Sequence, residues 1–353
     1  MSLVVYIKKY FGRFRLDVEF EAGSGEVTGL LGASGCGKSV TLKCVAGIEK
    51  PDEGRIVLDG RVLFDSERRI DLTPQRRRVG YLFQNYALLP NMTLAQNIAV
   101  GVRDRAKRRE TVERLVKSFY LEGCEGKYPR QLSGGQQQRA ALARILASEP
   151  EVLMLDEPFS ALDSYLKWQV ELELAELLER FPGPMLFVTH DRDEVRRLCG
   201  RVCVLDNGRS QAAQSVGELF DSPRTLSACL LSGCKNITRA RRVSEKRIVA
   251  LDWGVELEVE QELPEGLEYA GIRAHFVEPV EGPGPNRLLC RVERVVTEAF
   301  STVVMLATPG GSEGYSRLRM ELPQERWAAL AGRRELYLEL APERILPLRR
   351  PRR

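Results

Sequence analysis

The sequence predicts an α/β fold built on a parallel sheet, followed by a separate all-β region. Three observations lead to this prediction. Residues 27–47 pass from an apolar strand through a glycine-rich loop into a helical segment. Two later apolar runs, "EVLMLDEP" and "GPMLFVTH", flank a helical segment, an alternation typical of parallel sheets. From about residue 236 onward, short β-like runs are broken by Gly and Pro.

Composition is that of an ordinary globular protein. The 353 residues are 43% apolar and 29% charged, enough for two or three domains. The net charge of +4 is too small to indicate a nucleic-acid partner. We expect a cytosolic chain, because it shows neither an apolar run long enough to span a membrane nor a signal peptide. The 8 cysteines form no CxxC pair, so we expect reduced packing residues rather than a zinc or disulfide framework.

The elements follow in order along the chain. "SLVVYI" and "FRLDVEFE" alternate as strands do, "GRIVLDGRVLF" resembles a hairpin, and "RVGYLFQ" contains a short buried strand. Residues 88–150 become helical and charged, which predicts a helical subdomain inserted in the α/β domain. We place the domain boundary near residue 235. The predicted domains are therefore residues 1–235 and residues 236–353.

"GASGCGKS", from Gly32 to Ser39, fits the GxxxxGK[ST] pattern with a strand before it and a helix after it. Backbone amides freed by Gly35 and Gly37 can ring phosphates, Lys38 can reach the β and γ oxygens, and Ser39 can hold Mg²⁺. The motif predicts an α/β P-loop NTPase that uses ATP and Mg²⁺. The nucleotide contacts assigned to this stretch are Gly32, Ser34, Gly35, Cys36, Gly37, Lys38, Ser39 and Val40.

Two adjacent carboxylates end the apolar strand "VLMLDEP". Asp156 is the candidate Mg²⁺ ligand and Glu157 the candidate base that polarises the attacking water. His190 ends the run "MLFVTH" at the same sheet edge, where it can contact the γ-phosphate. Gln84 ends "YLFQ" beside that edge, where its amide can touch Mg²⁺ or the water. His275 has no such company and is interpreted as structural.

"RQLSGGQQQRAALA" places Ser133, Gly134 and Gly135 immediately before an alanine-rich helix. A helix start leaves amide groups without partners and carries partial positive charge. These residues can therefore serve as an ordinary N-cap or as an anion site, and taken alone the stretch favours neither.

The motifs together resemble the ATP-binding subunits of ABC transporters. The resemblance covers residues 1 to about 230 and includes, in order, "GASGCGKS", Gln84, "LSGGQ" from Leu132 to Gln136, "VLMLDE", "SALD" from Ser160 to Asp163, and His190. "LSGGQ" is highly specific to that family. The resemblance thus implies an ABC ATPase domain with a helical subdomain, and hydrolysis of ATP.

The same resemblance implies a head-to-tail homodimer. Each ATP would lie between the phosphate loop of one copy and Ser133, Gly134, Gly135 and Gln136 of the other, in a twofold arrangement. Asp163 would link the two sites across the interface. The adenine would stack on an aromatic near the N-terminus. We assign Phe11 to this role, with Tyr10 and Phe14 as alternatives.

A single cassette with a β-rich C-terminal region resembles an importer subunit that lies peripherally on the cytoplasmic face of the membrane. Its partners would be an integral membrane permease, received in a groove that includes residues 85–99, and through it an extracytoplasmic solute-binding protein. "SGCKNITRA" and "GIRAHFVEP" resemble the oligonucleotide-binding-like β domains of molybdate importers. That region would be either a regulatory oxyanion-binding domain or a dimerising appendage.

Molybdate or a related oxyanion, such as tungstate or sulfate, is the substrate that this resemblance favours. Polyamine or sugar import is the first alternative. A soluble ABC ATPase acting on nucleic acid is the second. No nucleic-acid partner is expected, since the C-terminal region lacks dense interleaving of basic and aromatic residues.

Overall fold

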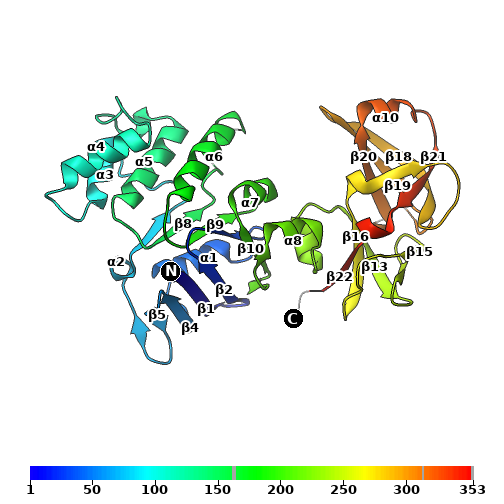
Figure 1. Ribbon diagram of the computed structural model, residues 1–353, viewed down its shortest axis with the longest axis horizontal. Helices are drawn as coiled ribbons and strands as arrows, with labels where there is room; N and C mark the ends of the chain where they lie inside the picture. Colours follow the sequence, from blue (N-terminus) through cyan, green and yellow to red (C-terminus); the bar gives the residue numbers. More distant parts are fainter. Residues whose placement is uncertain (161–163, 312–313, 351–353) are drawn as a thin grey trace. The chain divides into compact units, whose positions relative to one another are not determined.

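A computed structural model describes residues 1–160, 164–311 and 314–350, apart from the side chains of residues 164–166 and 169. The chain divides into two compact units, Met1–Val216 and Gly217–Arg353 (Figure 1). This division falls earlier than the predicted boundary near residue 235. As a result, most of helix α8 (Val216–Asp221) and all of α9 (Leu226–Leu231) belong to the second unit.

The first unit is built on one large sheet with the strand order β6-β5-β4-β1-β2-β11-β10-β3-β9-β8-β7. Strands β10, β3, β9, β8 and β7 run parallel, and every residue of β3, β8 and β9 is buried. Burial on both faces explains why these strands are continuous apolar runs in the sequence. The strands are β1 (Ser2–Phe11), β2 (Phe14–Gly23), β3 (Val27–Leu31), β4 (Glu53–Leu58), β5 (Arg61–Asp65), β6 (Ile70–Asp71), β7 (Val79–Leu82), β8 (Val152–Asp156), β9 (Met185–Thr189), β10 (Arg201–Asp206), β11 (Arg209–Ser210) and β12 (Gln214–Ser215).

Strands β1, β2 and β4 form an antiparallel ladder beside the parallel half, with Leu3 opposite both Ala22 and Leu58. The strand, loop and helix unit predicted for residues 27–47 is confirmed as β3, a loop and α1 (Lys38–Ala46). The remaining helices of this unit are α2 (Pro74–Arg77), α3 (Leu94–Gly101), α4 (Arg108–Ser118), α5 (Gly134–Leu146), α6 (Ser164–Glu179) and α7 (Arg192–Leu198). Helices α3, α4 and α5 lie together within the stretch predicted to be helical (Figure 1).

The second unit contains two five-stranded antiparallel sheets, which confirms the predicted change to β structure. Their orders are β15-β14-β13-β16-β22 and β17-β21-β18-β19-β20. Trp253 is fully buried in the core of this unit, where its indole nitrogen donates to the carbonyl of Tyr315 at 3.0 Å. The strands are β13 (Asn236–Arg242), β14 (Arg247–Ala250), β15 (Val255–Glu258), β16 (Leu267–Ile272), β17 (Val277–Val280), β18 (Arg287–Thr297), β19 (Ser301–Ala307), β20 (Arg317–Pro323), β21 (Glu335–Leu340) and β22 (Leu346–Arg349), with the short helix α10 (Gln324–Ala328).

The helices in the described ranges 1–160, 164–311 and 314–350 are all too short or too polar to cross a membrane.

Candidate functional site

The glycine-rich loop joins β3 to α1 and presents the first turn of that helix. Gly37 is the N-cap of α1 at φ 107°, a backbone conformation that residues with a side chain rarely adopt. A Cβ on Gly37 would also lie 2.4 Å from Cδ1 of Leu16. Glycine is therefore required here on two grounds. The arrangement leaves the amide groups of the first turn of α1 available to an anion.

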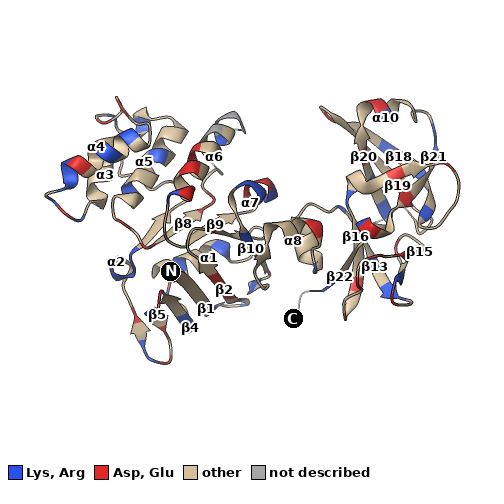
Figure 2. Cartoon of the chain, viewed as in Figure 1, with Lys and Arg blue, Asp and Glu red and all other residues tan. Residues whose placement is uncertain are grey.

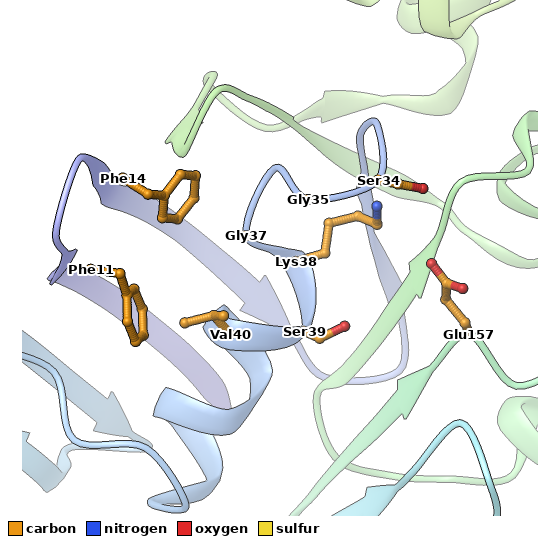
Figure 3. A pocket seen from close by; sticks show the side chains of 9 residues that line it. All are labelled: Phe11, Phe14, Ser34, Gly35, Gly37, Lys38, Ser39, Val40 and Glu157. Atoms are coloured by element: carbon orange, nitrogen blue, oxygen red, sulfur yellow. The ribbon is translucent and has the colours of Figure 1, made fainter.

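A pocket of about 400 Å³ opens over this helix start (Figure 3). Phe11 and Phe14, from the hairpin between β1 and β2, lie on one side of the loop, and Glu157 lies on the other. Tyr10 is not among the lining residues, and its hydroxyl donates to Glu53 at 3.0 Å. The lining residues are Phe11, Phe14, Ser34, Gly35, Gly37, Lys38, Ser39, Val40 and Glu157.

Gly32 and Cys36 of the loop lie outside that lining. Cys36 is buried, and a Cβ on Gly32 would fall 2.5 Å from its sulfur and 2.4 Å from the carbonyl oxygen of Leu205. These two residues therefore pack the loop against the body of the sheet. They shape the phosphate loop from beneath, while the other predicted contacts face the pocket.

Lys38 is 5% exposed although its side chain lines the pocket. Its amine donates to the carbonyl oxygens of Gly32 at 2.7 Å and Ala33 at 3.1 Å. A buried ammonium needs such acceptors because it has lost its water. The carbonyl groups of the loop thus hold the Lys38 ammonium in place. The ammonium has three N–H donors, so one remains after these two bonds.

Asp156 at the end of β8 is buried and hydrogen-bonded through both oxygens. Oδ1 accepts from the Ser39 hydroxyl at 2.9 Å, and Oδ2 accepts from the Tyr81 hydroxyl at 2.7 Å. Burial raises the pKa of Tyr81 strongly, and the bond to Asp156 raises it further, so Tyr81 remains a donor. The sequence analysis missed Tyr81, since one aromatic in an apolar strand is typical of a core residue.

Glu157 follows Asp156 in a left-handed conformation, at φ 45°. Its backbone amide donates to the carbonyl of Val188 at 2.9 Å, which anchors this unusual conformation to strand β9. Oε1 of Glu157 lies 3.3 Å from Nδ1 of His190. The structure therefore brings these two predicted residues together, with the Glu157 side chain 20% exposed and that of His190 58% exposed.

A charged network lies directly after His190. Lys167 of α6 donates to Oδ2 of Asp191 at 2.6 Å and pairs with Glu194 at 2.5 Å. Thr189 donates to the same Glu194 carboxylate and accepts from the amide of Asp191 at 2.9 Å. These contacts fix the residues immediately before and after His190, Thr189 and Asp191. Lys167 was also missed, because its partners lie 24 and more residues away and no local pattern marks them.

Asp191 and Lys167 of this network both stay ionised in the fold. Burial alone raises the pKa of Asp191, but the bond from Lys167 and backbone amides outweigh it, leaving this pKa below the usual 3.8. Burial alone lowers the pKa of Lys167, but its bonds to Asp191 and Glu194 bring the net value above 10.5. Both partners of the pair are therefore ionised across the neutral range.

Gln84 lies two residues beyond β7, is exposed, and is not among the residues that line the pocket. The next residues bend through two left-handed conformations, at Tyr86 (φ 58°) and Ala87 (φ 45°). Arg144 of α5 donates to the carbonyls of both, at 3.1 and 2.7 Å. The loop that begins at Gln84 is thereby tied to α5.

Ser133 is the N-cap of α5. Its hydroxyl accepts from the amide of Gln136 at 3.3 Å, and the Gln136 side chain accepts from the amide of Ser133 at 3.0 Å. This reciprocal capping box satisfies two amide groups of the helix start. Within one copy, Ser133 to Gln136 are therefore an N-cap and take no part in the pocket lining. Asp163 lies outside the described residues.

Comparison with known proteins places these features in context. The family model described as ABC transporter matches residues 16–160. The sulfate/thiosulfate import ATP-binding protein of Gloeobacter violaceus is 34% identical, over 98% of this chain and 96% of that protein. The corresponding protein of Brucella melitensis is 36% identical, over 92% and 90%. The molybdenum import ATP-binding protein of Paramagnetospirillum magneticum is 41% identical, over 62% and 60%.

Among solved structures, a dimeric ATP-binding cassette in a post-hydrolysis state, bound to ADP and Pi, is 29% identical with a TM-score of 0.51. The match covers 61% of this chain and 99% of that cassette. The near full-length relatives indicate one family, and the phosphate loop and the carboxylates at the end of β8 are consistent with it. This chain belongs to the ATP-binding proteins of ABC transporters.

Proposed function

We propose that this protein is the ATP-hydrolysing subunit of an importer for sulfate, thiosulfate, molybdate or a related oxyanion. The observation that carries the proposal is the arrangement of Ser39, Asp156, Glu157 and His190 beside the phosphate loop. The substrate class is supported by near full-length relatives that are sulfate/thiosulfate import proteins.

The donor set beside the loop fits Mg²⁺. The Ser39 hydroxyl and a carboxylate oxygen of Asp156 lie 2.9 Å apart, and both are hard oxygen ligands of the kind this ion prefers. Ser39 and Asp156 would hold Mg²⁺, with Gln84 as a further ligand if its loop moves toward the pocket. When bound, Mg²⁺ would neutralise charge on the β and γ phosphate oxygens. Tyr81 keeps Asp156 oriented toward Ser39.

Glu157 is the proposed general base. It accepts the proton of a water whose oxygen bonds to the γ-phosphorus, while the bond from that phosphorus to the β,γ-bridging oxygen breaks and ADP leaves. His190, in contact with Glu157, is placed to donate a hydrogen bond to the γ-phosphate. Lys38 would exchange a carbonyl partner for phosphate oxygens. Phe11 or Phe14 would stack on the adenine, since both line the pocket.

A second copy of the chain is proposed to complete each site. Its Ser133, Gly134, Gly135 and Gln136 would cover the γ-phosphate, with Asp163 linking the two sites across the twofold axis. Support comes from the exposed N-cap of α5, which does not line the pocket over the phosphate loop of its own chain, and from the dimeric state of a similar cassette.

The proposed location is the cytoplasmic face of the membrane, bound to an integral permease that receives solute from an extracytoplasmic binding protein. Leu89, Met92 and Val100 are exposed apolar side chains at 37%, 36% and 56% on the helical subdomain. Exposed apolar side chains of this kind suit contact with a helix of a permease. Nucleic acid is a poor alternative partner, since acidic and basic residues are interspersed in the second unit and paired, as in Arg247 with Glu258 (Figure 2).

Reconstitution tests the proposal. The ATPase, its permease and the cognate binding protein would be assembled in vesicles, and ATP hydrolysis would be measured with sulfate, thiosulfate, molybdate, tungstate, spermidine or maltose. We expect only an oxyanion to stimulate hydrolysis, and Glu157→Gln to abolish it while leaving ATP binding intact. Stimulation by spermidine or maltose would show that the substrate is a polyamine or a sugar rather than an oxyanion. Stimulation by RNA or DNA without a permease would contradict the importer proposal.

A further inference from the structure

Two buried cysteines of the second unit, Cys229 and Cys234, flank the turn that ends α9. Gly233 has φ 95° and its amide donates to the carbonyl of Leu230 at 3.0 Å. The amide of Cys234 donates to the carbonyl of Cys229 at 3.1 Å. This pair of bonds around a left-handed glycine is a Schellman motif, in which the outermost residues bring their side chains together.

The two thiols meet as this motif predicts. Their side chains lie within hydrogen-bonding reach of each other, and both belong to a small apolar cluster that includes Ile237, Leu346 and Leu348. The sulfur of Cys234 lies 3.3 Å from the carbonyl oxygen of Ile272. The Schellman turn and the apolar cluster therefore place the two thiols side by side, as an intrachain disulfide requires.

Arg273 supplies a positive charge beside the thiols. Its guanidinium donates to the carbonyl of Ser232 at 2.8 Å and to the Ser232 hydroxyl at 3.0 Å. The bond from Cys229, opposed by burial and aided by Arg273, leaves the pKa of Cys234 below its usual value. By contrast, burial raises the pKa of five other cysteines: Cys36, Cys44, Cys199, Cys203 and Cys290.

We propose that Cys229 and Cys234 form a redox-active dithiol that a low-molecular-weight disulfide, such as glutathione disulfide, converts to an intrachain disulfide. The Cys234 thiolate attacks one sulfur of the oxidant, forms a mixed disulfide and releases one small thiol. Cys229 then attacks the Cys234 sulfur, and the second small thiol leaves. The protein's two thiol protons pass to the two released thiolates, so the protein is oxidised and the small disulfide is reduced.

Access controls this reaction. Both cysteines are 0% exposed, so the oxidant reaches them only when the turn after α9 opens. The disulfide would then fix the end of α9 close to the start of β13. This site does not depend on the proposed importer function, and its oxidation is measured without ATP turnover.

The full-length reduced protein provides the test. It would be incubated in glutathione buffers of increasing oxidised fraction, quenched with acid, unfolded, alkylated with N-ethylmaleimide and digested for mass spectrometry. We expect loss of two alkylation sites and recovery of a tryptic peptide that contains both Cys229 and Cys234, with a mass two hydrogen atoms below that of its reduced, unalkylated form. Cys290→Ser should behave in the same way, whereas Cys229→Ser should leave glutathione attached to Cys234.

A second incubation, at a urea concentration just below the unfolding transition, opens the turn without unfolding the chain. Full alkylation of both cysteines at every glutathione ratio, with and without urea, would overturn the proposal. So would pairing of Cys234 with a different cysteine. Because the main measurement uses the unaltered chain, it does not depend on a variant's ability to fold.

Discussion

Tyr81 shows how one hydroxyl supports a site that it does not line. It is the donor to Oδ2 of Asp156, whose other oxygen faces Ser39. Tyr81→Phe leaves that buried oxygen one donor short, which we expect to lower the free energy of unfolding by about 1–3 kcal/mol. Turnover should fall as well, because Asp156 is free to turn away from Ser39.

The measurements are urea unfolding and ATPase kinetics. Tyr86→Phe is the matched control, because the Tyr86 hydroxyl donates to the carbonyl of Pro158 at 3.2 Å and does not touch Asp156. Equal ATPase loss in the two variants would contradict a specific role for Tyr81.

At the scale of elements, Lys167 joins α6 to the segment that carries His190. Lys167→Met should lower kcat by about tenfold with little change in KM, since it loosens His190 without touching the pocket. Lys167→Arg should retain most activity because it keeps the charge. A rise in KM that matches the loss of kcat would show that Lys167 acts on ATP binding instead.

The same variant predicts a pH dependence. Because the pKa of Asp191 is depressed in the fold, its pairing with Lys167 stabilises the protein above pH 3.8 and this contribution is lost as pH falls through the folded-state value. The stability difference between the unaltered chain and Lys167→Met should therefore be present at neutral pH and shrink as the pH falls below 3.8, as measured by urea unfolding.

Local and distant relationships explain what the sequence could predict. The phosphate loop is contiguous, so its spacing, its glycines and its flanking elements were all readable from residues 27–47. Asp156, Glu157 and His190 could be predicted as site residues because they follow apolar strands of a parallel sheet. Tyr81 and Lys167 were not found, because their partners depend on strand order and helix placement. Gln84 was predicted beside the phosphate edge, but its side chain does not line the pocket.

At the scale of the whole molecule, the proposed head-to-tail pairing makes each ATP site a composite site to which both chains contribute residues. Lys38→Ala damages the phosphate loop, and Ser133→Asp places a carboxylate where the partner's phosphate would lie. Each variant alone should be inactive. In a mixed dimer, one site carries both changes and the other carries neither, so mixing the two variants should restore part of the ATPase activity.

ATPase rates at varied mixing ratios would check this expectation. Restored activity should be greatest near equal amounts of the two chains. If mixing restores nothing although mixed dimers form, each site would be contained within one chain.

The capping box at α5 has a further consequence for that shared site. The Ser133 hydroxyl accepts from the amide of Gln136, so this bond occupies a lone pair and leaves its single hydrogen unused. Capping uses a lone pair of the hydroxyl and phosphate binding would use its hydrogen, so the two interactions do not compete for the same part of the group. An aspartate would cap the helix equally well but has no hydrogen to offer and would repel the anion. A hydroxyl side chain such as that of Ser133 can therefore cap the helix and still donate a hydrogen bond to the phosphate of the proposed second copy.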